Sequence, residues 1–177
     1  IVPRSRWGDF ARALPSKLCG GIDFGWENHS VVGIIGVDQE GRVYVPLVYG
    51  GAHLSDEEFG EIVRKIRDKL GVKLFFADSA HPKGIEAIKL AGVLNIKKAE
   101  KHIGRAEDFS SGIGSINYLM KRRMPDGSPV LKVNAEDRGC RVLDREIRHY
   151  RHPDNPHPET KAVSERPIHV GDDRCDA

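Results

Sequence analysis

Five aspartates stand at positions where a negative charge needs a partner. They are Asp23, Asp78 and a terminal cluster of Asp172, Asp173 and Asp176. Asp23 and Asp78 adjoin apolar runs, and burying a carboxylate is costly unless it is paired or binds a metal ion. The clustered acids repel one another unless a counter-ion lies between them. These positions are therefore the candidates for chemistry.

A metal site follows if the chain brings these acids together. Carboxylate oxygens are hard ligands that suit Mg²⁺ or Mn²⁺ rather than zinc. Two such ions, held roughly 3.5–4 Å apart, activate a water molecule and stabilise the leaving oxygen when a phosphodiester is cleaved. Asp23, which we expect at the centre of a sheet, is the candidate for a carboxylate that bridges both ions. If their segment is helical, Asp173 and Asp176 share one face of the helix.

Each acid also has a purely structural interpretation. Asp23 at a strand end can make turn contacts. Asp78 can serve as an N-cap or an Asx turn before the helix that begins at Pro82. Acids near a helix N-terminus favour the helix dipole, although three in five residues exceed that need. Taken singly, these interpretations remain open, whereas the ordered set favours a metal site.

Hydrophobic periodicity and turn residues predict the elements that must position the acids. We expect strands over residues 18–26, 31–37, 42–49, 72–77, 95–99 and 130–133. We expect helices over residues 55–71, 82–92, 105–123 and 140–150. The first three strands form an antiparallel meander, and the fourth is parallel because it follows a crossover helix. The fold class is therefore α/β, with a mixed sheet of five or more strands flanked by helices.

Local signals support these boundaries. Residues 38–41, Asp-Gln-Glu-Gly, have hairpin turn chemistry, with Gly41 available for positive φ. Ser55 and Glu58 form a capping box, and Gly71 is a helix stop. Residues 1–17 are polar and mixed, which predicts a linker ahead of a domain spanning residues 18–177.

Composition limits the classes of protein that fit. The chain has 177 residues, 39% hydrophobic and 31% charged, with a formal net charge of +2, so nucleic-acid binding must come from local patches. Three cysteines without C-x-x-C spacing argue against a disulfide framework or a zinc knuckle and favour a reducing interior. No apolar run approaches the ~20 residues of a membrane span. Without an initiator Met and with an abrupt end, the chain is expected to be part of a longer protein whose last helix is truncated.

Contacts to phosphate require cations near the acids. The candidates are Lys83, Arg105, Lys121, Arg122, Arg123, Lys161 and Arg166, with Lys97, Lys98 and Lys101 as further possibilities. Any one of them is more often a solvated charge, but Lys83 has the strongest position because it follows Asp78 closely. Residues 122–135 are a possible hairpin or flap over the site. The histidines, His81 included, are interpreted as polar loop residues rather than as a metal cluster.

Several segments, in this order, resemble the nuclease domain of bacteriophage terminase large subunits, the DNA-packaging motors. They are residues 21–25 (Gly-Ile-Asp-Phe-Gly), 76–85, 109–113, 146–150 (Glu-Ile-Arg-His-Tyr) and 173–177 (Asp-Arg-Cys-Asp-Ala). The resemblance covers about residues 18–177. It implies an RNase H-like fold and two-metal cleavage of double-stranded viral DNA concatemers with little sequence specificity. Beyond the chain it implies an N-terminal ATPase domain, the portal and the small terminase subunit as partners, and the cytoplasm of the infected bacterium as the location.

By the same resemblance, Asp23, Asp78 and Asp173 take the first, second and third catalytic positions. Asp172 and Asp176 are supporting metal ligands. Arg174 stands where relatives commonly have His, which leaves open whether Asp172 or Asp173 is the principal third ligand.

Other classes share parts of this pattern. A resolvase or transposase would use the same fold, but the middle segments favour a terminase. The segment Gly21–Gly25 also resembles a phosphate loop of actin-like and sugar-kinase ATP-binding domains, which normally need two such domains and more residues than this chain has. A non-catalytic DNA-binding domain of the same fold is the third alternative.

Overall fold

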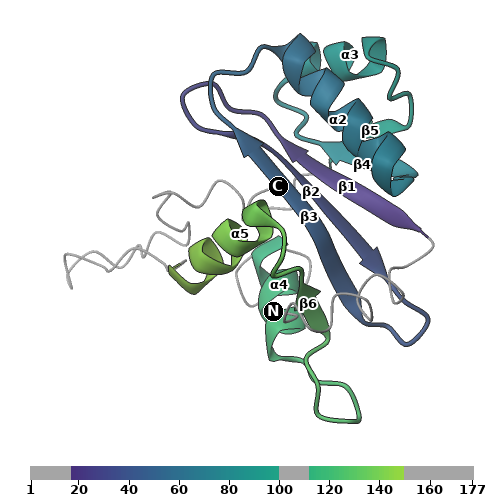
Figure 1. Cartoon of the computed structure of the whole chain (residues 1–177), viewed down its shortest axis with the longest axis vertical. Coiled ribbons are helices and arrows are strands. Elements are labelled where there is room, and N and C mark those ends of the chain that lie inside the picture. Colours follow the sequence, from purple (N-terminus) through teal and green to yellow (C-terminus); the bar gives the residue numbers. More distant parts are fainter. Residues whose placement is uncertain (1–16, 100–111, 150–177) are drawn as a thin grey trace, which may run out of the picture.

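The computed structural model of the chain describes residues 17–99 and 112–149. They form a six-stranded mixed sheet in the order β5-β4-β1-β2-β3-β6. Helices α2 and α3 cover one face of the sheet, and α4 and α5 lie against the other (Figure 1). Within the described residues, no helix is long and apolar enough to cross a membrane. The predicted α/β class with a mixed sheet is confirmed.

The first three strands form the predicted antiparallel meander. They are β1 (Leu18–Asp23), β2 (Ser30–Val37) and β3 (Val43–Gly51). β1 ends at Asp23 rather than at the predicted Trp26. In the turn between β2 and β3, Gly41 has φ +81° as its position required. The Asp38 carboxylate accepts the N–H groups of Glu40 and Arg42 at 2.9 and 2.8 Å, which fixes this turn.

The later strands extend the sheet at both edges. They are β4 (Leu74–Ala77), β5 (Ile96–Lys98) and β6 (Leu131–Val133). β4 pairs in parallel with β1, as predicted, and β5 pairs in parallel with β4. β6 pairs in parallel with β3 at the other edge, a neighbour that the sequence did not indicate. The sheet is therefore antiparallel in its middle and parallel at its flanks.

The helices on the first face begin within one residue of the predicted positions, and the second of them ends two residues before the predicted residue 92. α2 spans Asp56–Leu70; Ser55 and Glu58 form both halves of the capping box, and Gly71 ends the helix at φ +69°. α3 spans Pro82–Leu90, with Pro82 in its first turn. Both helices bury their apolar faces against β1, β4 and β5, in a core that includes Ile22, Phe59, Phe75, Ile88 and Ile96.

The second face carries α4 (Gly112–Lys121) and α5 (Arg138–His149). The predicted start of α4 at Arg105 lies outside the described residues. α5 begins two residues before the predicted Cys140 because Asp137 takes the N-cap position, where its carboxylate accepts the Cys140 N–H at 2.8 Å. The same carboxylate oxygen accepts the Val48 N–H of β3 at 3.2 Å, so the cap also ties α5 to the sheet.

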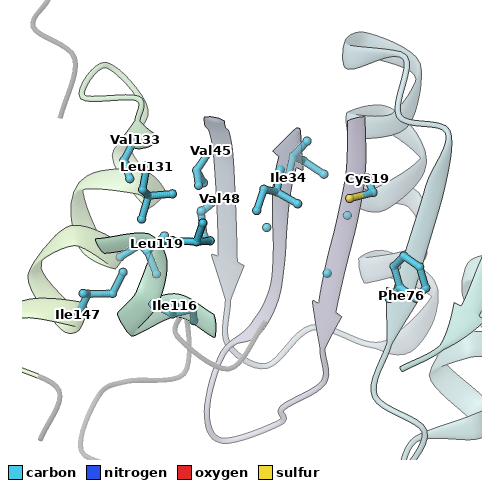
Figure 2. A pocket seen from close by; sticks show the side chains of 15 residues that line it. Cys19, Ile34, Val45, Val48, Phe76, Ile116, Leu119, Leu131, Val133 and Ile147 are labelled. Atoms are coloured by element: carbon cyan, nitrogen blue, oxygen red, sulfur yellow. The ribbon is translucent and has the colours of Figure 1, made fainter. Parts of the chain in front are cut away.

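An apolar cavity of about 250 Å³ lies between this second face and helices α4 and α5. In Figure 2, Leu119 and Ile147 of the helices lie on the same side of the sheet as Val48, a residue of the second core. Gly33 lines the cavity, and a Cβ built there would meet no atom within 4 Å. The second face is therefore less completely filled than the first.

Gly139 fixes how closely α5 approaches the sheet. A Cβ at this position would lie 1.6 Å from the Val48 carbonyl oxygen, which is backbone and has no rotamer to change. Cys140, directly after it, is fully buried. Glycine is therefore required here for contact rather than for an unusual backbone angle.

We predict that Gly139→Ala lowers the free energy of unfolding by about 1–3 kcal/mol, because the added methyl overpacks a rigid contact. The matched control is Gly33→Ala, whose methyl enters the cavity; it should leave stability unchanged or raise it by about 0.4–1 kcal/mol. Urea unfolding of the two variants and the wild type measures both values. Equal midpoints for Gly139→Ala and wild type would show that α5 does not approach β3 this closely.

Candidate metal centre

Asp23 and Asp78 lie side by side at the carboxyl ends of two neighbouring strands. Asp23 is the last residue of β1, and Asp78 follows the last residue of β4. The parallel register places Ile22 opposite Ala77, and the Asp78 N–H donates to the Ile22 carbonyl at 3.0 Å. The sheet ladder therefore holds the two acids together up to the point where the chain leaves it.

Both acids belong to the second face of the sheet. Ile22 and Ala77 are buried in the core under α2 and α3. Because successive strand residues point to opposite faces, the residues that follow them belong on the side of α4 and α5. Val31, the partner of Asp23 on β2, is buried among α5 side chains on that side. Asp23 and Asp78 are themselves half-buried, so they are partly shielded from water while remaining reachable.

The structural roles considered for these acids are present as well. Asp23 Oδ1 accepts the Phe24 N–H at 3.1 Å, and Asp78 Oδ1 accepts the Ala80 N–H at 3.0 Å in an Asx turn. An ionised carboxylate offers about four lone-pair sites, so one backbone contact does not exhaust it. The turn contacts orient the carboxylates and are compatible with metal binding.

Ser30 is a supporting residue that the sequence did not single out. It is 4% exposed, its hydroxyl donates to the Gly25 carbonyl at 2.7 Å, and the same oxygen accepts the Gly25 N–H at 3.2 Å. These bonds close the loop that follows Asp23. A buried serine that begins an apolar strand was the only available signal.

The donor set within the described residues is two carboxylates. Across residues 17–99 and 112–149, no group of three His, Cys, Asp or Glu side chains is close enough to hold a metal ion. The other predicted ligands, Asp172, Asp173 and Asp176, lie outside the described residues. Two adjacent carboxylates fit the oxygen chemistry of Mg²⁺ or Mn²⁺, with further ligands still to be supplied.

The predicted cations separate into two places. Lys83 lies in the first turn of α3, near the end of the sheet that carries the acids. Lys121, Arg122 and Arg123 lie at the opposite end, because Arg122 bonds to Val130, which bonds to the first residue of β3. β1 alone separates the two ends by six residues, or roughly 20 Å. Arg105, Lys161 and Arg166 lie outside the described residues.

The predicted hairpin after α4 is present but is placed elsewhere. An antiparallel bridge joins Arg123 to Pro129, and the Met124 N–H donates to the Ser128 carbonyl at 2.8 Å. The loop lies beside the turn between β2 and β3, where Arg42 approaches Asp126 at 3.5 Å. The expectation that residues 122–135 cover the acids was wrong, because β6 runs parallel to β3 and so begins at its far end.

Lys97 and Lys98 of β5 have a more informative position. Lys97 is paired with Phe76 and Lys98 with Ala77, so they belong to opposite faces of the sheet. Lys97 therefore shares the face of Asp78, whereas Lys98 belongs to the face of α2 and α3. Both are exposed on an edge strand, where lysines also protect against unwanted strand pairing.

Comparison with known proteins gives matches only among solved structures. No protein-family model and no curated protein sequence matches the chain. The nuclease domain of the bacteriophage SPP1 large terminase, solved with bound Mn, is 18% identical with a TM-score of 0.66; the match covers 100% of this chain and 88% of that one. The large terminase nuclease of the thermophilic phage G20c, solved with bound magnesium, is 16% identical with a TM-score of 0.60, over 90% and 76% of the two chains.

A longer relative matches equally well. The large terminase of another thermophilic bacteriophage, in complex with ATP-gamma-S, is 18% identical with a TM-score of 0.68. The match covers 99% of this chain but only 39% of that one. The chain therefore has the RNase H-like fold of phage large terminase nuclease domains.

Proposed function

We propose that this chain is a metal-dependent nuclease domain that cleaves double-stranded DNA. The observation that carries the proposal is the pairing of Asp23 with Asp78 on one face, at the carboxyl ends of parallel strands. In open α/β sheets, this edge is where ligands bind. The same fold carries Mn in the SPP1 protein and magnesium in the G20c protein.

In this proposal, Asp23 and Asp78 hold the metal, and Asp173, supported by Asp172 and Asp176, completes the set. Two divalent ions, when bound, supply an activated water and offset the charge that develops on the leaving oxygen. Asp23 is the candidate bridging ligand because it ends the strand between β4 and β2. The Phe24 and Ala80 N–H groups hold the two carboxylates in orientation through Oδ1.

The biological role we propose is cleavage of viral DNA concatemers during genome packaging in the cytoplasm of the infected bacterium. The nuclease would then act as one part of a longer protein with an ATPase domain, together with the portal and the small terminase subunit. The support is the longer large terminase described above, a protein bound to ATP-gamma-S in which a region of this fold makes up 39% of the chain.

A resolvase-type nuclease or a DNA-binding domain without activity would share this sheet. The acid pair favours an enzyme, since a binding domain has no need for adjacent carboxylates that repel DNA phosphates. The cleavage pattern separates the enzymes: a resolvase requires branched DNA, whereas the proposed nuclease cuts linear and plasmid duplexes.

We predict that Asp23→Asn and Asp78→Asn each lower Mn²⁺-dependent plasmid cleavage by at least about 100-fold, because loss of a ligand should exceed the 10–100-fold loss typical of outer-shell changes. Asp126→Asn, an exposed acid at the other end of the sheet, is the control and should retain activity. Gel analysis with Mn²⁺, Mg²⁺ or EDTA measures cleavage. Activity that survives EDTA, or full activity in the Asp23 variant, would falsify the mechanism.

We predict that Lys97→Ala weakens binding to duplex DNA several-fold and reduces the slope of log K against log salt by about 0.9, the value for one phosphate contact. Lys98→Ala is matched in charge and exposure but lies on the opposite face, so it should bind like wild type. Titration at several salt concentrations, with Ca²⁺ in place of a catalytic ion, gives both quantities. Equal losses in the two variants would mean that only overall charge matters.

A further inference from the structure

Phe24 links the two loops that carry the acids. It directly follows Asp23, yet its ring packs on the opposite face, against the core under α2 and α3. The ring centroid lies 4.9 Å from that of His81 and 5.9 Å from that of Phe59. His81 stands three residues after Asp78 in the other loop. A ring contact therefore joins the residue after one acid to the turn that follows the other.

His81 departs from the side chain that its position favours. It is the N-cap residue of α3, where Ser, Thr, Asp and Asn are preferred, and it makes no side-chain cap bond. Its Nε2 instead lies 2.9 and 3.1 Å from the two carboxylate oxygens of Asp56, in the first turn of α2. A residue that breaks a local preference while making a distant contact points to a constraint from function.

Gly84 shows how tightly this assembly is packed. A Cβ at this position would lie 2.4 Å from His81 Cδ2 and 2.4 Å from Phe24 Cε1. Gly84 is buried in α3, so the helix backbone itself closes over the two rings. The rings are thus held between α3 and Phe59 of α2, while Asp56 fixes the far side of the imidazole.

We propose that Phe24, His81 and Asp56 form a positioning assembly that sets the separation of the Asp23 and Asp78 carboxylates for one shared metal site. The inference deepens the proposed function and rests on it. The ladder controls the backbone only as far as the Ile22 carbonyl and the Asp78 N–H. Beyond that point the chain turns away in two loops, and the carboxylates repel each other before a cation binds. Contact between Phe24 and His81 opposes the separation of these loops.

An ordinary role in core packing is the competing explanation for these contacts. The two explanations predict different effects on stability and on metal affinity. Loss of packing lowers resistance to urea without altering the affinity of the folded protein for metal. Loss of positioning weakens metal binding even where the protein is fully folded. Metal affinity and stability must therefore be measured on the same variants.

The test is calorimetric titration of the whole chain with Mn²⁺, alongside urea unfolding without metal. We expect Phe24→Ala and His81→Ala each to raise the Mn²⁺ dissociation constant about 10-fold, at the low end of outer-shell effects. The double variant should bind Mn²⁺ no more weakly than the single variant with the lower affinity. The reason is that each substitution removes the same contact between Phe24 and His81. Asp56→Ala should weaken Mn²⁺ binding as well. Asp56→Asn should bind Mn²⁺ as the wild type does, because the Asn side chain still accepts a hydrogen bond from the imidazole.

The control is Ile66→Val, a buried change in the same core that lies ten residues beyond Asp56 on α2, or roughly 15 Å along the helix. It should lower the urea midpoint and leave the Mn²⁺ dissociation constant unchanged. Wild-type affinity in Phe24→Ala and His81→Ala, with Asp23→Asn still abolishing binding, overturns the positioning assembly alone. Absence of Mn²⁺ binding by the wild-type chain overturns both this inference and the proposed metal-dependent function.

Discussion

The parallel pairing of β1 with β4 is the constraint on which the candidate centre depends. With Ile22 opposite Ala77, two apolar side chains enter the core, and the two residues that follow are carboxylates on the other face. A shift of either strand by one residue would bury an acid and expose an apolar side chain. Burial of Ile22 and Ala77, which are 4% and 0% exposed, therefore fixes the register that brings the acids together.

The two faces of the sheet differ in how closely they are packed. The face under α2 and α3 is closely filled, and its contacts reach the loops beyond Asp23 and Asp78 through Phe24 and His81. The acids themselves lie on the face that contains the cavity. Sites held by a rigid layer are more accurately placed than sites built on loops alone. The acid pair thus has a closely packed layer on one side of the sheet and the less completely filled face on the other.

Much of this arrangement was readable from local sequence, and the remainder depends on distant contacts. The turn at Gly41, the capping box at Ser55 and the strand that ends before Asp78 were predicted because each depends on a few neighbouring residues. The edge position of β6 and the site of the hairpin after α4 were not, because β6 pairs with residues of β3 that lie 88 positions earlier in the chain. His81 was interpreted as a polar loop residue, since nothing near it in the sequence indicates Asp56.

The position of β6 determines when the sheet can be completed during synthesis. During synthesis, β1, β2 and β3 can pair as soon as Gly51 has left the ribosome, because each hairpin joins near neighbours. β4 closes the acid pair next, but the outer edge of β3 has no strand beside it until Leu131 emerges and pairs with Val43. While residues 52–130 are being added, the growing chain therefore presents an unpaired edge, and such edges are templates for association between chains.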